Sequence, residues 1–100
     1  MTPFQHRCRE RLERLMAERG LDAVFTGLPA HPDRTVQAED QSGHLRADVA
    51  GPRGVIELYL YRREAGFKVE GNWYVFERQR FAGETQLLEA LVRALEPWLA

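Results

Sequence analysis

Two amphipathic helical segments, one at each end of the chain, constrain the fold more than any other sequence feature. Residues 3–19 place apolar side chains every three or four positions among Arg and Glu, and Thr2 with Gln5 forms a capping signature at the start. The residues after Gly83 repeat Leu in the same way. Because each helix has only one apolar face, both need to pack on the same side of a shared layer.

The apolar stripes define which helix positions we expect to be buried. In the first helix the stripe consists of Phe4, Cys8, Leu12, Leu15 and Met16, and Gly20 is a natural stop. Pro97 lacks the N–H that would bond to the carbonyl of Arg93, so we expect the last helix to kink or end near Glu96. Its stripe consists of Leu87, Leu88, Leu91, Val92, Leu95, Trp98 and Leu99.

The residues between the helices predict an antiparallel sheet. Residues 21–33 read as an irregular connection with a short strand or turn at 23–26, and strand-like segments follow at 34–40, 44–50 and 55–61, separated by turn residues. The spacing of roughly ten residues is typical of a meander. The sequence therefore predicts a single α+β domain over residues 1–100, a two-layer sandwich with an antiparallel sheet of four to five strands and both helices on one face.

Alternation along residues 55–61 assigns aromatic side chains to the face away from the helices. The aliphatic set Ile56, Leu58 and Leu60 suits the covered face, which leaves Tyr59 and Tyr61 on the other. The remaining aromatic residues lie in the segment EGNWYVFERQRF, residues 70–81, and two interpretations of that segment assign them differently.

In the first interpretation, Gly71 and Asn72 form a two-residue type II′ turn and the segment is part of a hairpin. Trp73 and Val75 then lie on the outer face. The core-facing pairs are Val69 with Tyr74 and Phe67 with Phe76.

In the second interpretation, residues 66–80 form one continuous strand. Tyr74 and Phe76 are then the outer aromatic residues, together with Arg78 and Arg80. We favour the hairpin, because Gly-Asn between alternating apolar residues is a recognised turn signal.

An exposed cluster of aromatic residues beside arginine has the composition of a protein interface. The candidate partner-binding residues are Tyr59, Tyr61, Trp73, Val75, Arg46, Arg78 and Arg80. The alternative is that residues 21–33 fold over this face and make it ordinary core.

Composition limits the function classes. Acidic residues number 15 and basic residues 14, so the chain lacks the positive field of most nucleic-acid binders. One cysteine, Cys8, excludes an internal disulfide, and it lies on an apolar helix stripe where a buried, inert thiol is expected. No segment has the length and apolarity of a signal peptide core or a membrane span, which predicts a cytoplasmic protein without membrane association.

Catalytic, metal and cofactor signatures are missing from the sequence. His6 and Glu10 lie one helical turn apart, but no further ligands are identifiable, so we expect a solvated pair rather than a metal site. His44 follows turn residues and is expected to be exposed. We therefore expect no cofactor, no metal and no enzymatic activity.

The leading hypothesis is a small interaction module, such as an adaptor, a chaperone-like protein, an immunity protein or an inhibitor. It would bind a protein partner or itself through the outer sheet face. One alternative is a single-stranded nucleic-acid binder that stacks bases on the same aromatic rings and meets phosphates with the same arginines. A second alternative is a small enzyme that uses His31 and Asp33 in the irregular connection.

Overall fold

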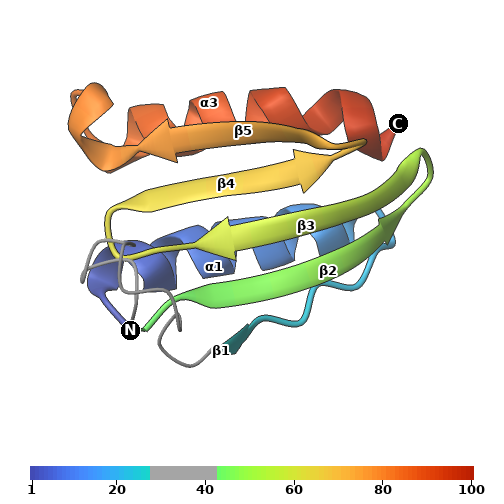
Figure 1. The fold of residues 1–100 in the computed structure, drawn as a ribbon, viewed down its shortest axis with the longest axis horizontal. Coiled ribbons are helices and arrows are strands. Elements are labelled where there is room, and N and C mark those ends of the chain that lie inside the picture. The colour runs from blue at the N-terminus through green and yellow to red at the C-terminus, as the bar shows by residue number, and fades with distance from the viewer. Residues whose placement is uncertain (28–42) are drawn as a thin grey trace.

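The computed structural model describes residues 1–27 and 43–100. Helix α1 leads into a five-stranded antiparallel sheet with strand order β1-β2-β3-β4-β5, and helix α3 follows (Figure 1). The predicted α+β class is confirmed. The predicted strand at 34–40 lies outside the described residues. The element bounds are α1 Pro3–Glu18, β1 Thr26–Gly27, β2 Leu45–Gly51, β3 Gly54–Leu60, β4 Glu64–Val69, β5 Asn72–Glu77, the 3-10 helix η1 Arg78–Arg80 and α3 Glu84–Leu99.

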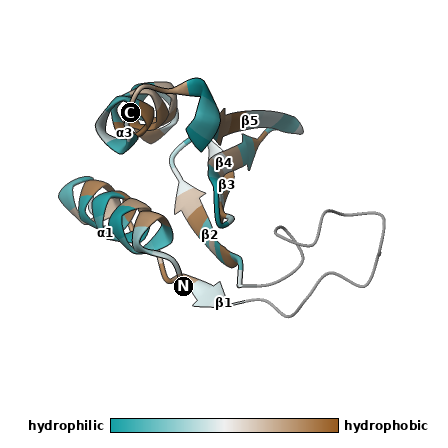
Figure 2. Ribbon diagram, turned by 90° about the vertical axis from the view of Figure 1, so that its left-hand side faces the viewer, coloured by the Kyte–Doolittle hydropathy of each residue, from teal (hydrophilic) through white to brown (hydrophobic). Residues whose placement is uncertain are grey.

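Both helices lie on the same side of the sheet, as predicted (Figure 2). Figure 1 shows α1 behind β2 and β3, and α3 behind β5. The core forms between the helices and the inner sheet face, and it contains all five stripe residues of α1. The fully buried inner residues of the sheet are Ala47, Val49, Ile56, Leu58, Leu60, Ala65, Phe67 and Val69.

The start and the end of α1 have the predicted capping geometry. The Gln5 N–H donates to the Thr2 hydroxyl at 3.2 Å, and the Thr2 N–H donates to the Gln5 side-chain oxygen at 2.8 Å. Gly20 has φ 70°, and the Leu21 N–H donates back to the Met16 carbonyl at 2.8 Å. Glycine at this position adopts the left-handed conformation without a steric cost, which ends the helix.

The C-terminal end of α3 contradicts one of the two predicted outcomes at Pro97, the end of the helix near Glu96. The helix continues through Pro97 to Leu99 instead of ending near Glu96. Proline removes one backbone bond, but the last turn is held by contacts with the β2–β3 connection. Arg53 donates to the Pro97 carbonyl at 3.0 Å, and its guanidinium lies 5.1 Å from the Trp98 ring centroid. Capping from a distant segment therefore extends the helix past the proline.

Strands β4 and β5 form a hairpin, so the continuous-strand interpretation is wrong. The predicted turn position is also wrong, by one residue. Glu70 and Gly71 are the central residues, with φ 52° and 80°, which is a type I′ turn, and Val69 pairs with Asn72. This register places Phe67 opposite Tyr74 with the rings stacked at 4.7 Å, and it replaces the predicted partners Val69–Tyr74 and Phe67–Phe76.

The predicted assignment of side chains to the two sheet faces is correct even though the turn lies one residue earlier than predicted. Moving a two-residue turn by one position changes each cross-strand partner by two positions, and strand alternation has a period of two. Trp73 and Val75 are therefore on the outer face, with exposed fractions of 54% and 51%, while Tyr74 and Phe76 face the core.

Candidate functional site

The candidate site is the outer face of the sheet, which we define as the face opposite the two helices. Within residues 1–27 and 43–100, no helix or strand covers it (Figure 2). Of the connection that was predicted as a possible cover, only residues 21–27 belong to the described part of the chain. The outer-face residues are Arg46, Asp48, Ala50, Val55, Glu57, Tyr59, Tyr61, Glu64, Gly66, Lys68, Trp73, Val75 and Glu77.

Aromatic rings run across this face in one continuous row. Tyr59 contacts Trp73 with ring centroids 4.9 Å apart, and it stacks on Tyr61 at 6.4 Å with an interplanar angle of 8°. His44 extends the row, with its ring 5.1 Å from that of Tyr61. His44 is only 8% exposed, so the prediction that it is solvent-exposed is wrong. Tyr61, which follows the end of β3, is one of the neighbours of this buried ring.

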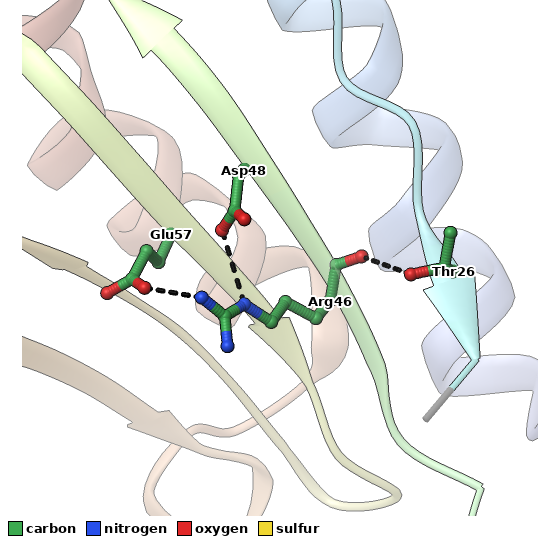
Figure 3. Close-up of polar contacts among 4 residues, drawn as sticks. All are labelled: Thr26, Arg46, Asp48 and Glu57. Atoms are coloured by element: carbon green, nitrogen blue, oxygen red, sulfur yellow. Dashed lines mark hydrogen bonds and ion pairs between the residues drawn. The ribbon is translucent and has the colours of Figure 1, made fainter. Parts of the chain in front are cut away.

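Arg46 connects the aromatic row to two acids on neighbouring positions. Its Nε donates to Asp48 at 3.2 Å and its Nη2 donates to Glu57 at 2.5 Å, while the guanidinium lies 5.6 Å from the Tyr59 ring centroid (Figure 3). The Thr26 hydroxyl on β1 donates to the Arg46 carbonyl at 3.4 Å. Arg46 is therefore held in place from both neighbouring strands.

The pKa values of Arg46 and Tyr59 are both raised on this part of the face. Partial burial disfavours the Arg46 cation, but its hydrogen bond to Asp48 and the nearby acids outweigh this effect and raise its pKa. Partial burial and the carboxylate of Glu57 also raise the pKa of the Tyr59 phenol. The raised pKa keeps the Tyr59 phenol neutral at physiological pH.

A recess of about 200 Å³ opens in the middle of the outer face. Gly66 lies between Tyr59 on β3 and Val75 on β5, and the missing side chain leaves the space empty. A Cβ atom at this position would be 2.5 Å from the Tyr74 carbonyl oxygen, so the strands approach too closely for any other residue without a shift. The recess is lined by Tyr59, Tyr61, Glu64, Ala65, Gly66, Trp73, Tyr74 and Val75.

Five of the predicted site residues, Arg46, Tyr59, Tyr61, Trp73 and Val75, lie together on the outer face. The other two lie beyond the end of β5, in η1.

In η1, Arg78 donates to the Phe81 carbonyl at 3.2 Å, and Arg80 donates to Glu77 at 3.1 Å.

The sequence prediction missed Gly66 and Lys68. An isolated glycine within a strand is a known signal of close backbone approach, and it was available in the sequence.

The other candidate chemistry lies apart from this face. His6 and Glu10 form an exposed pair at 3.1 Å on α1. Cys8 is fully buried, as predicted, and burial raises the pKa of its thiol to about 12. Among the described residues, no three His, Cys, Asp or Glu side chains gather as a metal site, and no helix is long and apolar enough to cross a membrane. His31 and Asp33 lie outside the described residues.

Comparison with protein-family models, with curated proteins and with solved structures finds no match for this chain.

Proposed function

We propose that this protein is a small interaction module that binds a protein partner through the outer face of its sheet. The observation that carries the proposal is the recess over Gly66, which lies within the aromatic row on a face that no described element covers. A recess of about 200 Å³ has room for one inserted side chain. Tyr and Trp around such a recess are the residue types that dominate binding energy in protein interfaces.

The charges of the outer face favour a protein over single-stranded nucleic acid. Arg46 is already paired with Asp48 and Glu57, and Glu64 and Glu77 add further negative charge. A phosphate backbone approaching the aromatic row would meet these carboxylates around Lys68, an outer-face cation that forms no ion pair among the described residues. A protein partner can instead present its own polar groups at the rim and one apolar or cationic side chain to the recess. We expect the module to act without a cofactor and in the cytoplasm.

A photo-crosslinking amino acid at position 73 tests this proposal in the source cells. The control carries the same amino acid at Glu89, which is exposed on α3, on the other side of the sheet. We expect one protein other than a second copy of this chain to be crosslinked from position 73 and not from position 89. Crosslinking of the same protein from both positions, or from neither, would contradict the assignment of the outer face.

The double variant Tyr59→Ala/Trp73→Ala provides the affinity test. Loss of two central interface aromatics lowers affinity by about 2 kcal/mol or more, roughly thirtyfold. The fold should remain, because Trp73 is 54% exposed and neither residue belongs to the buried core. Circular dichroism checks the fold, and an unfolded double variant would show that the aromatic row is a second core.

A further inference from the structure

Strand β5 lies at one edge of the sheet, and the direction in which its backbone N–H and C=O groups point can be assigned residue by residue. The Arg78 N–H donates to the Arg63 carbonyl at 2.8 Å, in continuation of the β4–β5 register. Antiparallel pairs alternate between hydrogen-bonded and non-hydrogen-bonded, so Asn72, Tyr74 and Phe76 bond to β4. The N–H and C=O groups of Trp73, Val75 and Glu77 therefore point away from the sheet.

The two edges of the sheet differ in how easily a strand of another chain can pair with them. At one edge, the described part of the chain contributes only the two residues of β1, which offer few backbone groups for pairing with another chain. At the other edge, β5 has six residues and contains neither lysine nor proline, the usual protective residues. Trp73 and Val75 on this strand are more than half exposed. The open edge at β5 is consequently the place where another strand can join the sheet.

We propose that β5 pairs antiparallel with β5 of a second copy of this chain, about a two-fold axis at Val75. Val75 then lies opposite Val75 of the partner subunit, and Trp73 lies opposite Glu77 of the partner subunit. The N–H and C=O groups of Trp73, Val75 and Glu77 point away from β4 and towards the partner subunit, so each of these cross-strand pairs is a hydrogen-bonded pair. The side-chain alternation also matches across the new junction, and two five-stranded sheets become one continuous sheet.

Charge complementarity identifies a second copy as the occupant. The Lys68 ammonium lies 5.2 Å from the Trp73 ring centroid, at the edge of the sheet, and it forms no ion pair within residues 1–27 and 43–100. Glu77 receives both of its side-chain hydrogen bonds, from Gln79 and Arg80, on Oε2, and Oε1 accepts none from the described part of the chain. The residue opposite Glu77 on β4 is Glu64, a like charge.

The same charges select the register. With Val75 on the axis, Lys68 reaches across Trp73 to Glu77 of the partner subunit, and the symmetry repeats this pair. A register shifted to an axis at Tyr74 would place Glu77 opposite Gly71 of the partner subunit and bring no acid of the partner subunit opposite Trp73, next to Lys68. The Val75 register therefore gives Lys68 an acid of the partner subunit, brings a second cation to Glu77 beside Arg80, and pairs the outward-pointing backbone groups of the edge.

Analytical ultracentrifugation of the whole chain tests this proposal. We expect the wild type to sediment as a dimer and Val75→Pro to sediment as a monomer with an unchanged circular dichroism spectrum. Proline is tolerated at edge positions whose N–H does not bond to the sheet, and the Val75 N–H points away from β4. The control Val75→Thr keeps the N–H and should remain a dimer. A monomeric wild type, or a dimer that Val75→Pro leaves intact, would overturn the proposal.

Charge reversal tests the register separately. Lys68→Glu and Glu77→Lys should each shift the equilibrium towards monomer, and the double variant Lys68→Glu/Glu77→Lys should restore the dimer, with circular dichroism confirming that each variant is folded. A double variant that stays monomeric would rule out this register. The dimer does not depend on partner binding by the outer face. Tyr59→Ala separates the two proposals, because Tyr59 lies on β3: this variant should weaken binding of the partner and leave the β5–β5 dimer unchanged.

Discussion

Arg7 on α1 holds Glu84, the first residue of α3, with two parallel hydrogen bonds, one from Nε to Oε2 and one from Nη2 to Oε1 at 2.8 Å. Both helices begin at the same end of the sandwich (Figure 1), so this pair joins their N-terminal turns. Glu84 also lies where the positive end of the α3 dipole favours an acid. The hydrogen bonds from Arg7 lower the pKa of the Glu84 carboxyl.

The Arg7–Glu84 pair predicts an acid-sensitive contribution to stability. A lowered pKa in the folded state stabilises the fold above the unfolded value of about 4.3, and the contribution disappears as the pH falls through the lower folded pKa. We expect Glu84→Gln to be less stable than the wild type at neutral pH and to lose less stability on acidification. Urea denaturation at several pH values measures both effects, and parallel pH profiles would contradict the prediction.

Gly66→Ala should destabilise the sheet. The new Cβ would lie 2.5 Å from the Tyr74 carbonyl oxygen, so β5 has to move away from β4, at a cost of about 1–3 kcal/mol. Gly27→Ala is the matched control, because its Cβ would meet only a Leu45 side-chain carbon at 3.8 Å. Urea unfolding of both variants checks the prediction, which fails if the two substitutions have equal effects.

Gln5 should contribute more to stability than its capping role suggests. It is fully buried, and its Nε2 donates to the carbonyls of Gly43 at 2.6 Å and Leu60 at 3.2 Å, which ties α1 to the sheet. Gln5→Glu keeps the acceptor for the Thr2 N–H but removes this donor and buries a carboxylate against two carbonyls. We expect it to cost more than Thr2→Ala, for which about 1 kcal/mol is typical. Thermal melts rank the two variants, and the reverse order would contradict the role of Gln5.

Cys8 should react with thiol reagents only when the chain unfolds. Its side chain is fully buried, and burial raises the pKa of the thiol to about 12, so the native protein presents almost no thiolate. Iodoacetamide labelling at neutral pH should be slow in the native state, and its urea dependence should follow the unfolding transition measured by fluorescence. Fast labelling of folded protein would show that α1 detaches from the sheet.

Single-stranded oligonucleotides should not bind with measurable affinity. The acids on the outer face neutralise Arg46, and the chain has a net charge of −1. A gel shift at low salt with a fluorescent oligonucleotide is the measurement, because electrostatic binding is strongest under those conditions. A salt-sensitive shift that is lost in Tyr59→Ala/Trp73→Ala would favour the nucleic-acid alternative.

Much of the candidate site followed from alternation alone. Tyr59, Tyr61, Trp73 and Val75 reach the outer face because strand periodicity survives an error in the hairpin register. The recess did not follow, because it depends on Gly66 being opposite Tyr59 and Val75 in three neighbouring strands. Arg78 and Arg80 were predicted as binding residues, but the chain turns into η1 after Glu77 and carries them past the end of β5.

The sequence by itself determined the features that arise from neighbouring residues: the capped start of α1, its apolar stripe, the inner face of β3 and the two-layer class. Tertiary structure decided the turn at Glu70 and Gly71, the passage of α3 through Pro97, the burial of His44 and the Arg7–Glu84 pair. The physical reason is that local periodicity fixes which side of an element is apolar, whereas these features depend on contacts between residues far apart in the chain.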